Sequence, residues 1–489
     1  MAFAIDSRRI GFALLAAVAT AVLVWFGTGL FPQWPLMWFA PLPILLFASR
    51  SSWWAAGLTA FAAWTAGDLN LWHYFTVALH GPLGVRVEIA AAPALVIALA
   101  VLLYRALLLR GAYWSALIAF PAVWVSFEYI FNLTSPHGTA ISLAYSQLNF
   151  LPMLQLASIT GPWGISFLLL SFSSAMAIGI HLRASAPSQA LRIVSVTVGV
   201  LAAVLIFGAV RLALPPPPRQ DVKVGLLASD LPENSDVAAP GAETERVLRD
   251  YAAQAEALVA RGAQVIVLPE HMGEIVDPST ADADEIFQSL ADKTGSTIVV
   301  GIGHLSPHVK YNQARVYAPL APVASYNKQH LLPPFESEFT PGRTLTTPGN
   351  SIATVSKPTG TWGVEICKDM DFTGLSRQYG QMNVGLMLVP AWDFDLDRFA
   401  HGHIAVMRGV ESGFGIARAA RRGYLTVSDN RGRILAETES NSAPFATLLV
   451  DVPAVHDNTI YLMFGDWFAW VVLATLCFTL VRVMGSRAH

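Results

Sequence analysis

Three polar residues sit at expected strand ends, where α/β folds tend to place active sites. Glu270 ends "QVIVLPE", Lys328 lies in "SYNKQHLLPPF", and Cys367 ends "TWGVEIC". A thiol becomes a strong nucleophile as the thiolate, and a carboxylate can take its proton and return it to a leaving group. A lysine can stabilise the oxyanion of a tetrahedral intermediate. These three residue types are therefore sufficient for acyl transfer through a thioester.

Each of the three residues also has a purely structural explanation. A lone cysteine after an apolar run is most often simply packed, a glutamate after Leu-Pro can favour a helix N-terminus, and a lysine can be solvated. Cys477, the only other cysteine, lies in a distant apolar run, so we expect no disulfide framework. His401 and His403 lack the HExxH spacing of a zinc site, and we expect neither a metal nor a cofactor.

The elements that must position these residues alternate between β-rich runs and amphipathic helical stretches. "VKVGLLA" and "QVIVLPE" are typical of strands, and "AETERVLRDYAAQAEALVARGA" between them is typical of a helix. We expect further strands in "STIVVGIGHL", "ARVYAPL", "TWGVEIC" and "VGLMLVPA". "HGHIAVMRGVESGFGIARAA" predicts a helix that runs into a strand. The alternation predicts an α/β layered domain.

The remainder of the chain is far more apolar. Of its 489 residues 54% are hydrophobic and 13% are charged, whereas a soluble domain carries about 25% charged residues. The net charge of −3 gives no reason to expect nucleic acid as a partner. Because a hydrocarbon core requires about 20 apolar residues per helix, we expect about eight transmembrane helices, near residues 9–29, 35–49, 54–75, 88–109, 114–133, 155–181, 192–212 and 461–483.

These spans predict a transmembrane domain over 1–215, a globular domain over 220–455, and a last helix with its tail over 456–489. The prolines of "RLALPPPPRQ" predict a stiff, extended exit from the membrane. Arginines gather before the first span, after the second, fourth and sixth, and after the last. Since loops rich in Lys and Arg stay cytoplasmic, we expect both termini in the cytoplasm. An odd number of spans then places the globular domain in the periplasm of a bacterial-type cell, at the inner membrane.

The polar motifs and the membrane half together resemble one family. "VIVLPE", "YNKQHLLPPFESEF" and "GVEICKDMDF" are similar to the Glu, Lys and Cys motifs of the nitrilase, or carbon–nitrogen hydrolase, superfamily. "PAVWVSFEYIF" and residues 143–170 and 403–435 are similar to the apolipoprotein N-acyltransferases, the membrane-bound branch of that superfamily. The resemblance implies an extracytoplasmic, nitrilase-like α-β-β-α sandwich joined to a multi-pass α-helical membrane domain.

The resemblance also implies a two-step reaction. Cys367 would attack an ester of a membrane phospholipid, typically phosphatidylethanolamine, and Glu270 would act as general base and acid while Lys328 stabilises the oxyanion. The α-amine of diacylglyceryl-cysteine at a lipoprotein N-terminus would then take the acyl group. Withdrawing an acyl chain into water costs about 0.8 kcal/mol per CH₂, so we expect the site at the surface of the lipid bilayer. Nothing in this scheme requires more than a monomer.

Further residues follow from the resemblance. A second glutamate follows the lysine motif, for which Glu338 is the first choice and Glu336 the alternative. Glu128 matches an acidic position in the family's membrane motif. Ionisable residues in spans are functional candidates, although interfacial exposure explains Asp68 and Glu88 equally well. The loops "DFDLDRFAHG" and "LLPPFESEFTPG" are candidate lids because they flank the site.

The chain departs from the family's pattern around these motifs. Leu268 stands where the family commonly has Trp, Lys368 and Asp369 replace Tyr-Glu after the nucleophile, and "PAWDFDLD", with Trp392, replaces an Asn-Asp-x-Trp-Phe loop. A cation at Lys368 could hold a thiolate or bind a phosphate headgroup. The departures leave the acceptor open between a lipoprotein amine, another amine, and water, as in amidases. A non-catalytic scaffold is the third alternative, and retention of the three motif residues argues against it.

Overall fold

The computed structural model describes residues 7–215, 221–278, 280–339 and 343–485. Backbone contacts divide the chain into two units. The first unit comprises Met1–Ser135, Thr139–Ala213 and Asp466–His489, and the second comprises Pro136–Gly138 and Leu214–Gly465. Residues 216–220 of the expected proline-rich exit lie outside the described residues.

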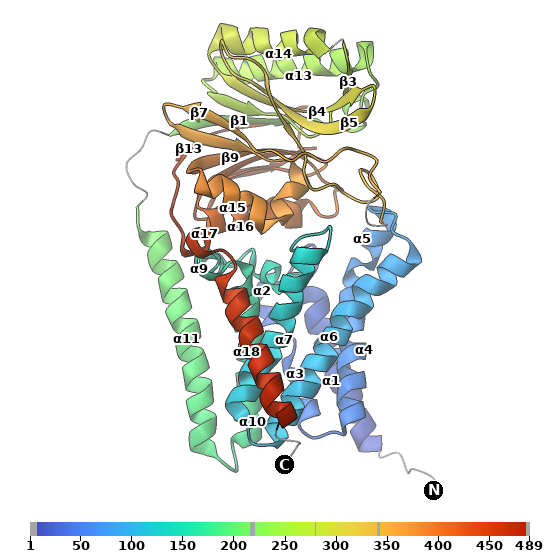
Figure 1. Ribbon diagram of the computed structural model, residues 1–489, viewed down its shortest axis with the longest axis vertical. Coiled ribbons are helices and arrows are strands. Elements are labelled where there is room, and N and C mark those ends of the chain that lie inside the picture. The colour runs from blue at the N-terminus through green and yellow to red at the C-terminus, as the bar shows by residue number, and fades with distance from the viewer. Residues whose placement is uncertain (1–6, 216–220, 279, 340–342, 486–489) are drawn as a thin grey trace. The chain divides into compact units, whose positions relative to one another are not determined.

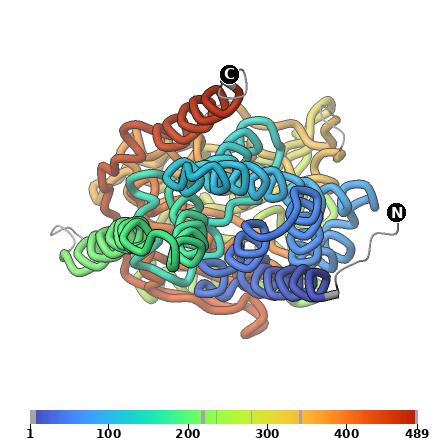
Figure 2. Tube along the Cα trace, turned by 90° about the horizontal axis from the view of Figure 1, so that it is seen from below, coloured from blue at the N-terminus to red at the C-terminus, as the bar shows by residue number. Residues whose placement is uncertain are grey.

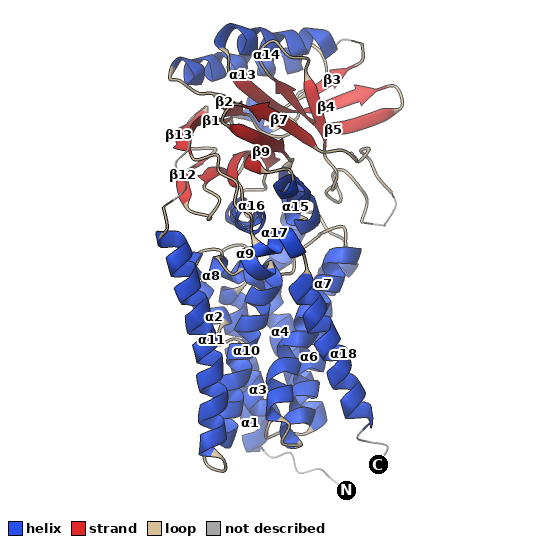
Figure 3. Ribbon diagram, turned by 60° about the vertical axis from the view of Figure 1, so that its left-hand side comes forward, coloured by secondary structure: helices blue, strands red, loops and turns tan. Residues whose placement is uncertain are grey.

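The first unit consists of helices, whereas the strands of the described residues all belong to the second unit (Figure 3). Its helices are α1 (Ser7–Gly27), α2 (Trp34–Met37), α3 (Leu42–Ala48), α4 (Trp53–Asp68), η1 (Leu69–Leu71), α5 (Trp72–Val77), α6 (Leu83–Leu109), α7 (Tyr113–Thr134), η2 (Leu143–Gln147), α8 (Leu151–Leu154), α9 (Ala157–Thr160), α10 (Pro162–Leu182), α11 (Pro187–Ala213) and α18 (Trp467–Gly485). Within this unit α4 packs against α1 and α6, and α7 packs against α6, α10 and α18. Seen from below, α11 and α18 lie at the edge of the bundle (Figure 2).

Among the described residues, six helices are long and apolar enough to cross a membrane, namely α1, α6, α7, α10, α11 and α18. The expected span at 35–49 is instead two short helices, because prolines at positions 41 and 43 interrupt it. The expected span at 54–75 ends as α4 at Asp68 and continues as η1 and α5. The expected span at 155–181 begins only at Pro162, because Gly161 adopts a positive φ of 64° between α9 and α10.

The second unit contains two sheets. The seven-stranded sheet has the order β13-β1-β2-β4-β5-β6, with β3 beside β4, and the six-stranded sheet has the order β12-β11-β10-β9-β8-β7. The pairs β1–β2, β2–β4, β8–β9 and β9–β10 are parallel. The strands are β1 (Val222–Ala228), β2 (Val265–Val267), β3 (Glu274–Val276), β4 (Thr297–Ser306), β5 (Val309–Tyr317), β6 (Ala324–Asn327), β7 (Ala353–Lys357), β8 (Gly360–Val364), β9 (Val384–Trp392), β10 (Gly415–Arg421), β11 (Tyr424–Ser428), β12 (Ile434–Glu439) and β13 (Ala446–Val452).

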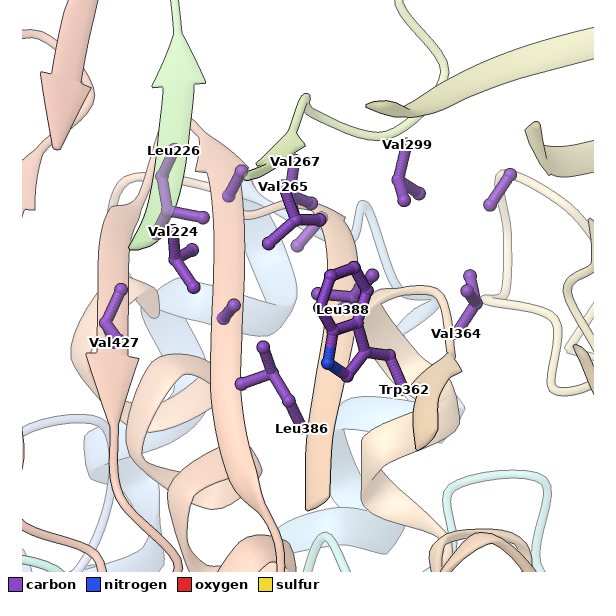
Figure 4. Packing of buried hydrophobic residues seen from close by; sticks show 14 of the residues in the cluster. Val224, Leu226, Val265, Val267, Val299, Trp362, Val364, Leu386, Leu388 and Val427 are labelled. Atoms are coloured by element: carbon purple, nitrogen blue, oxygen red, sulfur yellow. The ribbon is translucent and has the colours of Figure 1, made fainter. Parts of the chain in front are cut away.

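Helices cover the outer face of each sheet, so the unit is an α-β-β-α sandwich (Figure 1). The central core joins the two sheets, with Val224, Val265 and Val267 of one packed near Trp362 and Leu386 of the other (Figure 4). A second core lies under α13 and α14, and a third under α15 and α16. The helices of this unit are α12 (Pro232–Ser235), α13 (Ala242–Ala260), α14 (Thr280–Thr294), η3 (Cys367–Asp371), α15 (Thr373–Gln381), α16 (Arg398–Ser412) and α17 (Ile460–Phe464).

Candidate active site

Glu270, Lys328 and Cys367 are buried residues that follow strands of the two sheets in the second unit. Glu270 follows β2, and Lys328 follows β6 of the same sheet. Cys367 follows β8 of the other sheet and begins η3. The backbone N–H of Glu270 donates to the carbonyl of Ala391 on β9 at 3.2 Å, which ties the loop after β2 to the opposite sheet. The charges of Glu270 and Lys328 both act on the Cys367 thiol.

Lys328 is the centre of a buried ionic cluster. Its Nζ donates to Glu270 Oε1 at 2.7 Å and lies 2.8 Å from Glu336 Oε2, and the side chain is 2% exposed. Asn312 Nδ2 donates to Oε1 of both glutamates, at 2.6 Å and 2.5 Å. Burial alone would lower the pKa of Lys328, but the two carboxylates outweigh it and hold that pKa well above its usual range. Lys328 is therefore a fixed cation at neutral pH.

The second glutamate that contacts Lys328 is Glu336, the alternative from the sequence, and not Glu338, the first choice. Glu336 Oε2 also accepts from the backbone N–H of Leu332 at 2.8 Å. Burial opposes its charge, but Lys328 and Asn312 prevail and lower the pKa of Glu336. The Glu338 side chain is 43% exposed and pairs with Arg343 at 3.4 Å. The "ESE" sequence offered two glutamates of similar context, and only the folding of the loop separates them.

Cys367 is a buried thiol on a strained backbone. It is 6% exposed and has a φ of +45°, which an L-residue with a side chain seldom adopts. Its Sγ lies 3.5 Å from the carbonyl oxygen of Trp392. Burial, and next the charge of Glu270, raise the pKa of the thiol, whereas a hydrogen bond with His401 and the charges of Lys328 and Arg418 act in the opposite direction. Cys477, in contrast, is exposed on α18.

Asp369 is an anchor for the lysine loop. Its side chain is fully buried, and Oδ1 accepts from the backbone N–H groups of Gln329 and His330 at 3.2 Å and 2.8 Å and lies 3.0 Å from His330 Nδ1. Its Oδ2 accepts from Tyr326 OH at 2.7 Å and from the Ile366 N–H at 3.3 Å. One carboxylate thus connects the chain on both sides of Lys328 to the start of η3.

Lys368, which directly follows Cys367, is buried. Its Nζ donates to the carbonyl of Leu331 at 3.1 Å and lies 3.5 Å from Nδ1 of His137, which belongs to the second unit. Burial lowers the pKa of Lys368 to about 8. Burial, and next the charge of Lys368, lower the pKa of His137 to about 3. His137 was not a candidate from the sequence, because its partner lies more than two hundred positions away.

His401 is the main side chain that the sequence interpretation missed, since it was set aside with His403. The Cys367 sulfur, a carboxylate oxygen of Asp393 and a ring nitrogen of His401 all lie within 4.8 Å of one another. Arg418 on β10 holds Asp393 with two hydrogen bonds, of 2.9 Å and 2.5 Å. A signal was present in the spacing: Asp393, Asp397 and His401 recur at intervals of four, and the last interval opens α16.

The loops that flank the site contact one another. Phe335, in the expected lid "LLPPFESEFTPG", stacks on Phe394 of "DFDLDRFAHG", with ring centroids 5.3 Å apart. Thr340–Gly342 of the first loop lie outside the described residues. Trp392, at the end of β9, carries the guanidinium of Arg421 over its ring at 3.6 Å. Arg421 also donates to the His271 carbonyl at 2.8 Å, so it supports the loop of Glu270.

The acidic candidates of the first unit have different surroundings. Glu128 is buried on α7, where its Oε1 accepts from Trp124 Nε1 at 2.6 Å, from the Leu143 N–H at 2.7 Å and from Ser166 Oγ at 3.0 Å. Glu128 therefore connects α7 to η2 and α10. Asp68 is half-buried at the end of α4, and Glu88 is exposed on α6.

Comparisons with known proteins cover both units. The model of the apolipoprotein N-acyltransferase N-terminal domain matches residues 14–175, and the carbon-nitrogen hydrolase model matches residues 238–455. The apolipoprotein N-acyltransferase of Geobacter metallireducens is 27% identical over 473 residues, which cover 90% of this chain and 89% of the relative. That of Bradyrhizobium diazoefficiens is 28% identical, with 81% and 74% covered.

Among solved structures, Saccharomyces cerevisiae Nit3, a member of branch 10 of the nitrilase superfamily, aligns at 20% identity with a TM-score of 0.40. The alignment covers 47% of this chain and 90% of that chain.

Proposed function

The chain belongs to the apolipoprotein N-acyltransferase family, the membrane-bound branch of the carbon–nitrogen hydrolase superfamily, and from this premise we propose that it N-acylates lipoproteins through a thioester on Cys367. The acyl donor is a membrane phospholipid, of which phosphatidylethanolamine is the first candidate. The acceptor is the α-amine of a diacylglyceryl-cysteine at a lipoprotein N-terminus. The name of the relatives supports the acceptor, and the donor rests on the resemblance of the sequence motifs to this family.

The observation that carries this proposal is the cluster around Lys328, adjacent to a buried thiol. Lys328 is 2% exposed between two carboxylates, so it is a fixed cation that can stabilise an oxyanion without reorganisation. Glu270 accepts from both Lys328 and Asn312 through one oxygen, which leaves its second oxygen to exchange a proton with the thiol.

In the first half-reaction the Cys367 thiol gives its proton to Glu270, and the sulfur attacks the ester carbonyl carbon of the phospholipid. Lys328 stabilises the oxyanion that forms. The carbon–oxygen bond of the ester then breaks, and the lysophospholipid alkoxide takes the proton back from Glu270. The thiol of a buried cysteine has a raised pKa, so the proton transfer to Glu270 is coupled to the attack.

In the second half-reaction the acceptor amine attacks the thioester carbonyl and gives a proton to Glu270. The carbon–sulfur bond breaks, and Cys367 recovers the proton as a thiol. Glu336 holds Lys328 and Asn312 in place through both half-reactions. The mechanism requires no metal or other cofactor, because each proton and electron pair is accounted for by these side chains and the substrates.

We also propose that residues 220–455 form the catalytic domain and lie in the periplasm, with both termini in the cytoplasm. The division of the chain into two compact units supports the start of this domain, because the main segment of the second unit begins at Leu214. That unit extends to Gly465, ten residues beyond the expected boundary at 455. The orientation is supported by the arginines at positions 8, 9, 50, 105, 110, 183, 192, 482 and 487, which lie at or near the expected cytoplasmic ends of spans.

A trapping experiment tests the nucleophile. The purified protein is incubated with phosphatidylethanolamine, digested, and analysed by mass spectrometry for an acyl group on the peptide of Cys367. We expect the acyl-thioester in the parent and in Cys477→Ala, and none in Cys367→Ala. An unmodified Cys367 peptide in a folded parent protein would contradict the proposed function.

A further inference from the structure

His401 lies between two carboxylates and next to the nucleophile position. Its Nδ1 is 3.6 Å from Asp393 Oδ1, and its Nε2 is 3.5 Å from Asp397 Oδ2. Both carboxylates are fully buried, and the His401 side chain is 20% exposed. The Cys367 sulfur belongs to the same cluster, within 4.8 Å of the ligand atoms of Asp393 and His401.

The partners of Asp393 decide what this cluster can do. Both of its oxygens accept hydrogen bonds from the guanidinium of Arg418, a pair that is almost fully buried. A cation that is already bound in this bidentate manner would repel a metal ion at the same carboxylate. The arrangement is therefore suited to hold a protonated ring instead of a metal, although cysteine, histidine and aspartate are all possible ligands.

The charges on the other side of Cys367 explain why a second cation is needed. Lys328 is the cation of the ionic cluster, and it faces two carboxylates, Glu270 and Glu336. When Glu270 is ionised, this cluster has a net charge of about −1, which opposes a thiolate at Cys367. A further cation near Cys367 would stabilise a thiolate that forms there, and the His401 ring on α16 lies within 4.8 Å of the sulfur.

We propose that His401 is a further catalytic residue, which as an imidazolium pairs with the Cys367 thiolate. The inference rests on the proposed role of Cys367 as the nucleophile and adds a residue to the same site. Each ring nitrogen faces a carboxylate, so the ring keeps both of its protons and is not the base that deprotonates the thiol. That proton goes to Glu270, and His401 stays charged while the carbon–sulfur bond forms and breaks.

The groups that face His401 favour its charged form. Asp393 and Asp397 approach it from the loop before α16, Cys367 and Asp371 from η3, and Arg418 on β10 is the opposing cation. Burial would lower the pKa of His401, but the carboxylates outweigh it and raise that pKa well above the usual value. The hydrogen bond with His401 also lowers the pKa of the thiol, against the effects of burial and Glu270.

The test measures how the reactivity of the Cys367 thiol depends on pH. In a Cys477→Ala background, the full-length protein in detergent is treated with iodoacetamide between pH 5.5 and 10, and the alkylation rate of Cys367 is followed by mass spectrometry. We expect His401→Gln to move the rate profile to higher pH by about one unit, which lowers the rate near pH 7 about tenfold. His401→Lys, which retains a cation, should stay closer to the parent profile.

Two further variants keep the result interpretable. His403→Gln is the matched control, because His403 lies on the same helix but bonds to the Phe399 carbonyl at 2.9 Å and stacks on the Phe399 ring; its profile should equal that of the parent. His401→Asn replaces His401→Gln if the latter does not elute as folded protein. A profile of either neutral variant that superimposes on the parent overturns the role of His401. Absence of an acyl-thioester in the parent would instead contradict the proposed function.

Discussion

Glu336 and Glu338 lie two positions apart and have opposite surroundings. Glu336 is buried against Lys328, Asn312 and the Leu332 N–H, whereas Glu338 pairs with Arg343 at the surface. We expect a buried carboxylate that holds the proposed catalytic cation to contribute far more than an exposed ion pair, which is worth about 0–1 kcal/mol. The two glutamates therefore provide a matched pair of substitutions.

We expect Glu336→Gln to lower the rate of acyl transfer at least about tenfold, because Lys328 loses one of its two carboxylates and shifts from the oxyanion position. Glu338→Gln should stay within about twofold of the parent, since it removes only an exposed pair. The measurement is the initial rate of acyl transfer to a lipopeptide. Equal losses in the two variants would show that the loop tolerates neither change and that burial does not distinguish the two glutamates.

The lowered pKa of Lys368 predicts how the stability of the folded protein depends on pH. Its pKa in the folded protein is about 8, below the ordinary 10.5. Between pH 8 and pH 10.5 the unfolded chain therefore binds a proton that the folded chain lacks, so the stability of the folded state rises with pH across this window. Below pH 8 both states hold the proton, and the cost of burying the charge is constant.

We accordingly expect Lys368→Met to be more stable than the parent at pH 7, by on the order of 2 kcal/mol, and the difference to shrink as the pH rises from 8 towards 10.5. The apparent Tm in detergent, measured at pH steps, tests this expectation. A difference in Tm that does not change with pH would mean that Lys368 contributes through packing alone.

Sequence reasoning identifies candidate residues at strand ends more readily than side chains that meet across the fold. Glu270 and Cys367 were candidates because a short apolar run leads into each, and Lys328 because of its motif "SYNKQHLLPPF". Lys328 and Glu336 lie eight positions apart, but which glutamate turns inwards depends on the path of the loop. His137 and Arg418 lie far in sequence from Lys368 and Asp393, and no periodic pattern connects such pairs.

At the scale of elements, the lysine loop after β6 is positioned by η3. Asp369 accepts hydrogen bonds from Tyr326, Gln329 and His330 on one side and from Ile366 on the other. A fully buried carboxylate with several donors is expensive to remove, because the donors stay buried without a partner. The Lys328 loop and the Cys367 turn therefore form one structural unit through this side chain.

We expect Asp369→Ala to cost about 3 kcal/mol and to lower the apparent Tm by about 5–10 °C. Asp250→Ala, which breaks an exposed pair with Arg246 on α13, should change Tm by less than about 2 °C. The measurement is the Tm of each variant and of the parent, from thermal unfolding curves in detergent. A Tm for Asp369→Ala equal to that of Asp250→Ala would contradict the anchoring role.

The elements with a strong period or a long apolar run were predicted closely. "VKVGLLA" is β1, and the amphipathic stretch from Ala242 begins and ends near α13. The apolar stretches at 35–49 and 54–75 were expected as spans, but proline and short polar breaks divide them. Hydropathy alone reports how apolar a stretch is and says nothing about whether its backbone hydrogen bonds can continue.

At the scale of the whole molecule, the described part of the chain combines six helices long and apolar enough to cross a membrane with an α/β sandwich. An acyl donor and an acyl acceptor that both reside in lipid give a reason for this combination, since moving either chain into water is costly. The proposed orientation places the catalytic domain on the periplasmic side of the membrane.

Single-cysteine labelling tests this orientation in a Cys477→Ala background. Leu320→Cys lies on an 89% exposed turn between β5 and β6, and we expect a membrane-impermeant maleimide to label it in spheroplasts. Ala184→Cys, in the exposed loop between α10 and α11, should be labelled only after permeabilisation. The reverse pattern would place the catalytic domain in the cytoplasm.

Transfer itself tests the central claim most directly. The purified protein is loaded with phosphatidylethanolamine labelled in its sn-1 acyl chain, freed of excess lipid, and chased with a synthetic diacylglyceryl-cysteine lipopeptide. An N-acetylated lipopeptide serves as the matched control, and Cys367→Ala as the control for loading. We predict that the label leaves Cys367 and appears on the free α-amine, and that the acetylated peptide receives none. Label that appears only as free fatty acid would contradict the account, because water would then be the acceptor.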